Sequence, residues 1–406
     1  MRVLFLSETL DPDSGGIGTS ACRIASWIAK SGVELRMLTF CPGSDLDVIC
    51  HVERVETMHG CECRIVPHFV NAPVSCSAKK KATIRRNAFY IASLVTQDVQ
   101  PDLIHSFSLT EAAYLGTLLA RRFDLPHVVS VRGNDLGRGS FQADRFEILR
   151  WIIGNCAMAT FVNWYLLAVA AGLYPDACWK YRVVPNSIEV RPYPAVDARR
   201  RRALLEAVGV RSSSFLVSFT GNLREKKGPW TLLEAFGALR EEFDASLLII
   251  GRADGLGDFS KMVSEFPFCR DVHVLGTLPR ELVRDYQEIC DVAIFPSLDD
   301  GMANGLLESM ERARPVIVSD VFADVVRDRM DGFVCSRFEV GEFSAALCTL
   351  ARDRELRIRL GKIARERVAK AFSPEHESLE YVRAYETAVQ RSLRSRPYGG
   401  RRSDQR

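Results

Sequence analysis

The chain has almost no excess of charge of either sign: its 406 residues include 54 lysines and arginines against 51 aspartates and glutamates. A net charge of +3 gives no electrostatic case for nucleic acid as a partner, because that partner requires a basic surface. The basic residues gather instead at residues 199–202 and 391–406. We interpret both groups as solvated surface, and contact with an anionic membrane surface is the alternative.

The twelve cysteines also lack the paired spacings of a disulfide framework, and the N-terminus lacks a signal-peptide cleavage pattern. We therefore predict reduced thiols and a cytoplasmic location. Cys61 and Cys63 stand two residues apart, which is a poor ligand spacing for structural zinc. We expect no metal.

Long uncharged runs are scarce, and one segment, residues 151–175, is long enough to span a bilayer. Gly154, Asn155, Asn163 and Gly172 interrupt it. The sequence therefore predicts a buried helix–strand–helix of an α/β domain, with a transmembrane span as the alternative.

Short apolar runs alternate with helical stretches along the chain, a pattern typical of a parallel sheet covered on both faces. In the first half the predicted strands are residues 3–7, 34–40, 63–67, 103–106, 127–131 and 159–162. The predicted helices there are residues 19–31, 83–95, 109–122 and 165–171. In the second half the predicted strands are residues 215–220, 247–251, 272–275, 292–295 and 316–319.

The most informative block is the loop Asp-Gly-Met-Ala-Asn-Gly at residues 300–305, which follows a strand-like run and precedes a helix-like run. A loop of this kind leads into a helix N-terminus, whose free N–H groups and dipole favour an anion. Asp300 and Glu308 flank the loop and can accept hydrogen bonds from hydroxyls. A site that combines N–H groups for a phosphate with carboxylates for sugar hydroxyls indicates a sugar nucleotide as the ligand.

This block resembles the E-x7-E signature of retaining glycosyltransferase family 4, the glycosyl transferases group 1. Asp300 stands where the first acid is usually Glu, and Glu308 is in its expected place. The resemblance covers roughly residues 1 to 390. It implies an α/β fold of the GT-B type, with two Rossmann-like domains facing each other across a cleft and a C-terminal helix that crosses back to the N-terminal domain.

The resemblance also implies roles for these residues. Asp300 would bond hydroxyls of the transferred sugar, and Glu308 would accept from the ribose hydroxyls. The residues implied to bind the sugar and phosphate of the donor are Met302, Ala303, Asn304 and Gly305.

The domain boundary is predicted at residues 183–187, which resemble the Pro-Asn-Gly interdomain turn of the family with Ser187 in place of Gly. The resemblance implies an acceptor-binding domain over residues 1–187 completed by a helix at 374–391, and a nucleotide-sugar-binding domain over residues 188–373. We expect residues 392–406 to form a disordered basic tail.

Gly15 and Gly16 follow the first strand and let the backbone approach a phosphate, although a plain tight turn is the alternative. A nicotinamide-binding motif is disfavoured because the spacing is not G-x-G-x-x-G and no acid closes the second strand. In the resembled family a Gly-Gly pair lies here near the donor diphosphate, so Gly16 is predicted to bind the donor.

Residues 220–228 follow a strand and resemble the Gly-Arg-Leu…Lys-Gly loop of the family, in which two cations hold the diphosphate. Lys227 matches the lysine, Asn222 occupies the usual arginine position, and Arg224 is the candidate for the missing guanidinium. A solvated basic turn is the alternative. Without a metal or other cofactor, fixed cations must stabilise the charge of the leaving diphosphate. Arg224, Lys227 and Asp300 are therefore the predicted catalytic residues.

Residues 127–135 resemble a family strand that ends in His-Gly-x-Asp, with Arg132 where His is common. Arg132 is a candidate for binding a phosphate or an anionic acceptor. Asp135 is a further candidate, with a structural pairing to Arg132 as the alternative. His105 also falls on a family position, and a satisfied buried histidine is its alternative.

We hypothesise a retaining glycosyltransferase of the hexosyltransferase type, which moves a sugar from a nucleotide-sugar donor to an acceptor hydroxyl in glycan, polysaccharide or glycolipid biosynthesis. The acceptor is a glycan, a lipid-linked sugar or a small molecule, and an anionic membrane surface is a peripheral partner. A sugar-nucleotide epimerase of the same fold is one alternative. A catalytically degenerate nucleotide-sugar-binding protein is another, because Asn222, Arg132 and Asp300 depart from the family pattern.

Overall fold

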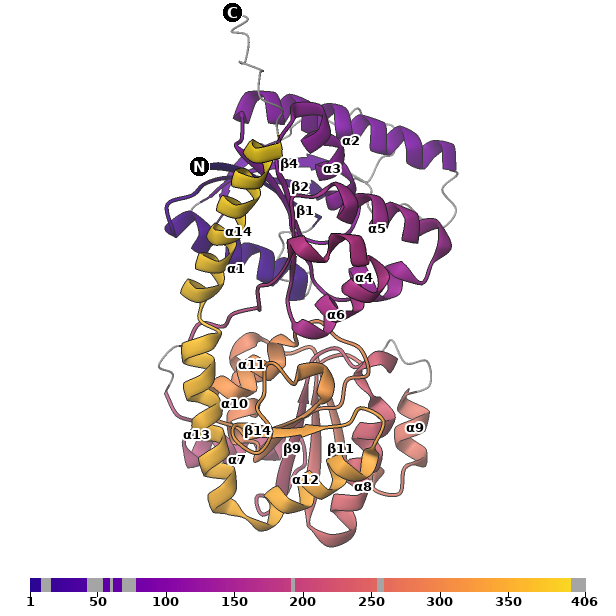
Figure 1. Ribbon diagram of the computed structural model, residues 1–406. Coiled ribbons are helices and arrows are strands. Elements are labelled where there is room, and N and C mark those ends of the chain that lie inside the picture. The colour runs from indigo at the N-terminus through magenta and orange to yellow at the C-terminus, as the bar shows by residue number, and fades with distance from the viewer. Residues whose placement is uncertain are drawn as a thin grey trace, which may run out of the picture. The chain divides into compact units, whose positions relative to one another are not determined.

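The computed structural model describes residues 1–8, 16–41, 54–58, 61–67, 78–190, 194–253 and 259–395. The chain divides into two compact units, Met1–Pro185 with Pro374–Arg406, and Asn186–Ser373 (Figure 1). Each unit is built on its own sheet, and the last helix returns to the first unit.

The first unit contains an eight-stranded sheet in the order β3-β4-β2-β1-β5-β6-β7-β8. Its strands are β1 (Arg2–Ser7), β2 (Glu34–Cys41), β3 (Arg54–Met58), β4 (Cys61–Pro67), β5 (Leu103–Ser106), β6 (His127–Val131), β7 (Met158–Phe161) and β8 (Tyr181–Val183). Neighbours are parallel except for β3 and β4. β5, β6 and β7 are buried along their whole length, as expected of parallel strands that are covered on both faces.

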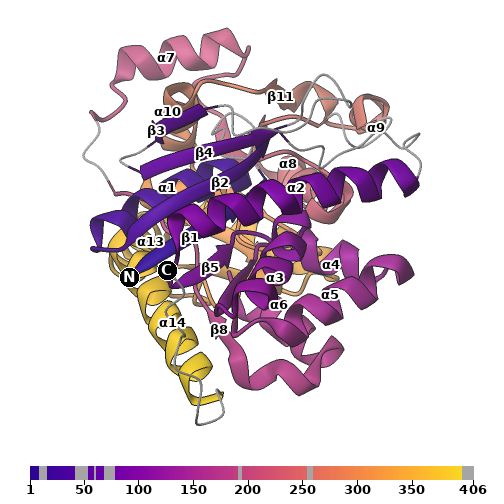
Figure 2. The same ribbon diagram turned by 90° about the horizontal axis from the view of Figure 1, so that it is seen from above.

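Helices cover both faces of this sheet (Figure 2). α1 (Gly16–Lys30) and α14 (Pro374–Ser395) pack on one face, and α2 (Ala78–Val99) and α3 (Glu111–Phe123) pack on the other. α14 buries Tyr381, Ala384, Tyr385 and Ala388, a spacing of three and four residues that makes one apolar stripe. The helix ends at Ser395, four residues beyond its predicted end at Arg391.

The uncharged segment at residues 151–175 contains the end of α5 (Ala143–Asn155), then β7, then α6 (Trp164–Leu173). This is the predicted helix–strand–helix. No helix in the described part of the chain is both long enough and apolar enough to cross a membrane.

The second unit contains six parallel strands in the order β11-β10-β9-β12-β13-β14. They are β9 (Phe215–Thr220), β10 (Ala245–Ile250), β11 (Val272–Gly276), β12 (Val292–Phe295), β13 (Val316–Ser319) and β14 (Gly332–Cys335). The helices are α7 (Ala198–Ala207), α8 (Pro229–Glu242), α9 (Phe259–Glu265), α10 (Arg280–Ile289), α11 (Asn304–Glu311), α12 (Val340–Arg352) and α13 (Arg354–Ala371). α8 packs against α12, and α7 and α10 share a core cluster with β9 and β10.

Five strands, β5, β6, β9, β12 and β13, have the bounds that the sequence predicts. β3, β8 and β14 were not predicted. β8 and β14 are only three and four residues long. β3 is an antiparallel edge strand, and the sequence analysis expected parallel strands only. Short and edge strands carry little hydrophobic periodicity.

Candidate active site

The loops that follow β9 and β12, two neighbouring strands, are tied together at the carboxyl edge of the second sheet. The N–H of Leu298 donates to the carbonyl of Lys226 at 2.8 Å. Gly228 has a φ of +67°, and a Cβ there would lie 2.1 Å from the carbonyl oxygen of Pro296. Only glycine allows this approach. Because open parallel sheets bind ligands beyond the carboxyl ends of their strands, this pair of loops is the candidate site.

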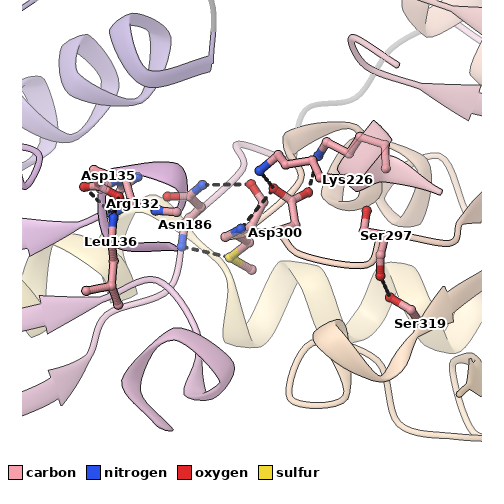
Figure 3. Close-up of polar contacts among 12 residues, drawn as sticks. Arg132, Asp135, Leu136, Asn186, Lys226, Ser297, Asp300 and Ser319 are labelled. Atoms are coloured by element: carbon pink, nitrogen blue, oxygen red, sulfur yellow. Dashed lines mark hydrogen bonds and ion pairs between the residues drawn. The ribbon is translucent and has the colours of Figure 1, made fainter. Parts of the chain in front are cut away.

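Asp300 lies between two lysines of the other loop (Figure 3). The side chain of Asp300 accepts from Lys226 Nζ at 3.4 Å, from Lys227 Nζ in a closer ion pair, and from the N–H of Gly301 at 2.9 Å. Burial alone would raise the pKa of the Asp300 carboxyl, but the lysine charges and hydrogen bonds hold that pKa below its usual value. The structure therefore brings two predicted catalytic residues, Asp300 and Lys227, into contact, and adds Lys226.

The other predicted cation, Arg224, is exposed at the start of the same loop, and its carbonyl accepts from the N–H of Lys227 at 2.8 Å. Asn222, at the position where the family usually has arginine, accepts from the N–H of Arg252 at 3.4 Å. The N–H of Leu223 donates to the carbonyl of Arg252 at 2.7 Å. Asn222 therefore helps to join this loop to the one that follows β10.

Asn186 contacts the 300–305 loop directly (Figure 3). The N–H of Asn186 donates to Sδ of Met302 at 3.0 Å. Its side-chain amide donates to the carbonyl of Met302 at 3.4 Å and to Oδ1 of Asn304 at 3.3 Å. The sequence marked Asn186 only as part of a domain boundary, and the structure adds it to the candidate site. The family-like turn at 183–187 was the signal available for it.

α11 begins at Asn304, directly after Ala303, so the predicted loop leads into a helix N-terminus. Gly305 packs against the end of β9, where a Cβ would lie 2.6 Å from the carbonyl oxygen of Thr220. This contact is a packing reason for the glycine.

Glu308 lies one turn further along α11 and is partly buried. Gln287, a fully buried residue of α10, donates to Glu308 Oε2 at 3.4 Å and to Thr220 Oγ1 at 3.3 Å. Sequence reasoning did not find Gln287, because its importance depends on α10 packing against α11.

Asp135 holds two loops of the first unit together at the carboxyl edge of its sheet. Its carboxylate accepts from the main-chain N–H groups of Arg132 at 3.0 Å, Gly133 at 2.7 Å and Leu109 at 2.8 Å. The sequence offered a structural pairing of Asp135 with Arg132 as the alternative to substrate binding. In the structure Asp135 does pair with Arg132, through the main-chain N–H of Arg132.

His105 is fully buried in β5, and both ring nitrogens have partners. Nδ1 lies 2.7 Å from the hydroxyl of Tyr385, and Nε2 lies 2.8 Å from the hydroxyl of Ser130. Burial, together with the charges nearby, holds the pKa of His105 well below its usual value, so the ring is neutral. This geometry is that of a satisfied buried histidine and gives no support to substrate binding by His105.

Gly16 is the first residue of α1, and residues 9–15, which precede it, lie outside the described ranges. Cys61 and Cys63 both belong to β4. Over the ranges that the structure describes, no group of three or more His, Cys, Asp or Glu side chains is arranged to hold a metal ion.

Family models match both units of the chain. Residues 15–163 match the glycosyl transferase 4-like domain, and residues 214–353 match the glycosyl transferases group 1. The chain belongs to the group 1 glycosyltransferases. The second match contains the lysine pair, Asp300 and Glu308.

Relatives of this glycosyltransferase include an Escherichia coli enzyme, UDP-Gal:alpha-D-GlcNAc-diphosphoundecaprenol alpha-1,3-galactosyltransferase. The two are 25% identical over 284 residues, which is 67% of this chain and 72% of the relative.

Two solved structures share the fold. Sucrose-phosphate synthase from Thermosynechococcus elongatus has a TM-score of 0.77 at 17% identity, covering 96% of this chain and 100% of the other. Anabaena HepE in complex with UDP and glucose has a TM-score of 0.74 at 16% identity, covering 95% and 99%. The predicted GT-B fold of this glycosyltransferase is thus confirmed, with two Rossmann-like units and a C-terminal helix that belongs to the first.

Proposed function

We propose that this glycosyltransferase transfers a sugar from a nucleoside diphosphate donor to an acceptor hydroxyl with retention of the anomeric configuration. The observation that carries the proposal is the placement of Asp300 between Lys226 and Lys227, directly before the loop that leads into α11. This arrangement offers cations and N–H groups to a diphosphate, and a carboxylate to sugar hydroxyls.

The lysines act on the leaving group. As the bond between the anomeric carbon and the phosphate oxygen breaks, the nucleoside diphosphate gains negative charge, which Lys227, Lys226 and Arg224 stabilise. A diphosphate must compete with Asp300 for the ammonium groups, since Asp300 pairs with both lysines. No metal or other cofactor is invoked in this scheme.

Retention is explained by attack on the same face of the sugar. The acceptor oxygen forms its bond to the anomeric carbon on the side that the phosphate leaves, and the departing phosphate oxygen takes the acceptor proton. Asp300 acts as a hydrogen-bond acceptor rather than as an acid, because its lowered pKa keeps it ionised at neutral pH. The protein supplies positioning and charge stabilisation.

Other residues hold the donor. Met302, Ala303, Asn304 and Gly305 would meet the sugar and phosphate, and Gly16 would approach the diphosphate. Glu308 would accept from the ribose hydroxyls, with Gln287 orienting its carboxylate. Asn186 would support the loop through Met302 and Asn304.

The substrates of the relatives suggest which compounds to test first. The Escherichia coli relative is named for UDP-galactose and a diphosphoundecaprenol-linked acceptor, and HepE was solved with UDP and glucose. We therefore propose a uridine nucleotide sugar as donor and a lipid-linked sugar as acceptor, which would place the enzyme at the cytoplasmic face of a membrane as a peripheral protein. Polysaccharide or glycolipid biosynthesis is the corresponding process.

The test is the thermal stability of the protein against a panel of nucleoside diphosphates and nucleotide sugars. A ligand at 100 times its dissociation constant stabilises the folded state by about 2.7 kcal/mol. We expect one nucleotide to raise the melting temperature, and we expect Glu308→Ala to lose that response. Glu234→Ala, an exposed glutamate of α8 in the same unit, is the matched control and keeps the response. A folded protein that responds to no nucleotide contradicts the proposal and favours a degenerate site.

A further inference from the structure

Glu8 directly follows β1, and its carboxylate is hydrogen-bonded through one oxygen only. The carboxylate accepts from the main-chain N–H groups of Glu111 and Ala112 and from the hydroxyl of Thr110. These donors lie at the start of α3, where the first N–H groups of a helix have no partner within the helix. Oε1 of Glu8 is buried and has no hydrogen-bond partner among the described residues, so the three bonds fall on Oε2.

The environment of Glu8 leaves Oε1 in need of a hydrogen-bond donor. Burial raises the pKa of the Glu8 carboxyl, and the nearby charge of Glu111 adds to that rise, although the hydrogen bonds to Oε2 oppose it. Glu111 is itself bonded by Arg85, whose Nε donates to it at 2.9 Å. A buried polar atom without a partner is costly, so an O–H or N–H group of a ligand at Oε1 would stabilise this carboxylate.

Glu8 also lies where the connections of the first sheet reverse direction. β1 lies between β2 and β5 in the sheet. α1, which follows β1, packs on one face, and α3, which follows β5, packs on the other. The carboxyl edge between β1 and β5 is therefore a topological switch point, the place where open parallel sheets bind ligands. Glu8 and its partners on α3 meet at this point.

The charge of Glu8 indicates which groups can bind there. A carboxylate offers acceptors only, so it attracts hydroxyl groups and repels phosphates. Arg132, the candidate cation of the same edge, follows β6 instead. Its guanidinium lies 4.3 Å from the ring centroid of Phe107, and Nη1 donates to the hydroxyl of Tyr381 at 3.2 Å. The end of β1 is thus suited to a neutral, hydroxyl-bearing part of a substrate.

We propose that Oε1 of Glu8 accepts a hydrogen bond from a hydroxyl group of a bound sugar substrate. The proposal rests on the proposed function and adds a residue that recognises the sugar. Both the transferred sugar and a glycan acceptor carry hydroxyl groups, so the experiment has one arm for each source.

Glu8→Gln tests this bond while keeping the support that residue 8 gives to α3. The N–H groups at the start of α3 require an acceptor, so the amide oxygen takes the place of Oε2. The amide NH2 group, which only donates, then takes the place of Oε1. The variant should therefore keep a melting temperature close to that of wild type and lose the bond to the sugar.

Calorimetry on the full chain measures the affinities. The donor arm compares UDP with UDP-glucose and UDP-galactose. The acceptor arm titrates N-acetylglucosamine, glucose and galactose with the tighter nucleotide sugar at saturation, so that the donor sugar is already in place. We expect Glu8→Gln to weaken binding at least tenfold in one arm, which identifies the source of the hydroxyl, while UDP affinity stays within twofold.

Two variants serve as controls. Glu111→Gln removes the neighbouring negative charge and should leave every affinity within twofold of wild type. Thr110→Val removes one donor to Oε2, so it should lower the melting temperature without weakening sugar binding. Equal loss of sugar affinity in Thr110→Val and Glu8→Gln would mean that Glu8 only supports the start of α3, which overturns the proposal.

The proposal is also overturned if Glu8→Gln matches wild type in both arms, including the case in which no free sugar binds. UDP binding to wild type is measured in the same series. Failure of the proposed function, seen as no UDP binding, is therefore distinguished from failure of the role of Glu8.

Discussion

At the scale of single residues, the pairing of Asp300 with Lys226 and Lys227 makes one carboxylate responsible for two tasks. It pairs with the two lysines, and with a donor bound it would hold the sugar. A substitution of Asp300 should therefore affect nucleotide binding and sugar transfer differently.

Asp300→Asn is therefore expected to lower transfer without lowering nucleotide affinity. Loss of the competing carboxylate leaves the lysines available to a diphosphate, so UDP affinity is expected to stay the same or rise. Transfer is expected to fall about 100-fold, because the sugar is no longer positioned. Calorimetry with UDP and a transfer assay measure the two effects.

Asp299→Asn is the control for this change, since it makes the same substitution one residue earlier, and we expect wild-type values from it. A parallel loss of UDP affinity and transfer in Asp300→Asn would show that Asp300 supports the folded loop and does not act on the sugar.

At the scale of elements, the candidate site depends on the approach of the loop before α8 to the loop after β12. Gly228 combines a left-handed φ with a close contact to the backbone of Pro296. Gly209, in the same unit, has a similar φ of +70°, yet no atom lies within 4 Å of where its Cβ would be. Comparing alanine variants of the two glycines therefore distinguishes the cost of a left-handed φ from the cost of a steric clash.

Gly209→Ala is expected to destabilise the protein by about 1–2 kcal/mol through the left-handed conformation alone. Gly228→Ala is expected to cost at least about 1 kcal/mol more, because the Pro296 carbonyl must move. Urea unfolding measures both, and UDP binding should weaken only in Gly228→Ala. Equal free energies of unfolding for the two variants would mean that the loops can separate without cost.

At the scale of the whole molecule, the described part of the first unit buries His105 and His127, and burial keeps both rings neutral. Burial lowers the pKa of His127 to about 3, from an ordinary value near 6.5. Between these values the unfolded chain binds the proton that the folded chain excludes. The contribution of the neutral histidine to the free energy of unfolding is therefore fully present above about pH 6.5 and is lost as the pH falls below that value.

This linkage predicts the acid sensitivity of the protein. Each such histidine lowers the free energy of unfolding by up to about 1.4 kcal/mol per pH unit as the pH falls from 6 towards 4. His127→Gln is expected to reduce that slope by the share of one histidine, whatever its effect on stability at pH 7. Urea unfolding at a series of pH values measures the slope, and an unchanged slope would exclude His127 as a cause.

Some features of the fold and the candidate site were predictable because they depend on neighbours in the chain. Buried parallel strands are rich in apolar residues, so β6 and β12 were predicted with their observed bounds. Asp300, Lys227 and Glu308 could be named as candidates because they lie on a strand-to-helix loop or the first turns of its helix. β3 and β8 were missed, since edge and very short strands are specified by their partners in the sheet.

The sequence by itself determined the α/β class, the family, and the loops that meet at the carboxyl edge of the second sheet, because alternation, glycines and charges are local in the chain. Only the tertiary structure decided which side chains act together. Lys226 meets Asp300, Gln287 meets Glu308, and Tyr381 meets Arg132 across 74, 21 and 249 positions of sequence. Such pairs arise when strands and helices pack, and packing depends on the whole core rather than on any local pattern.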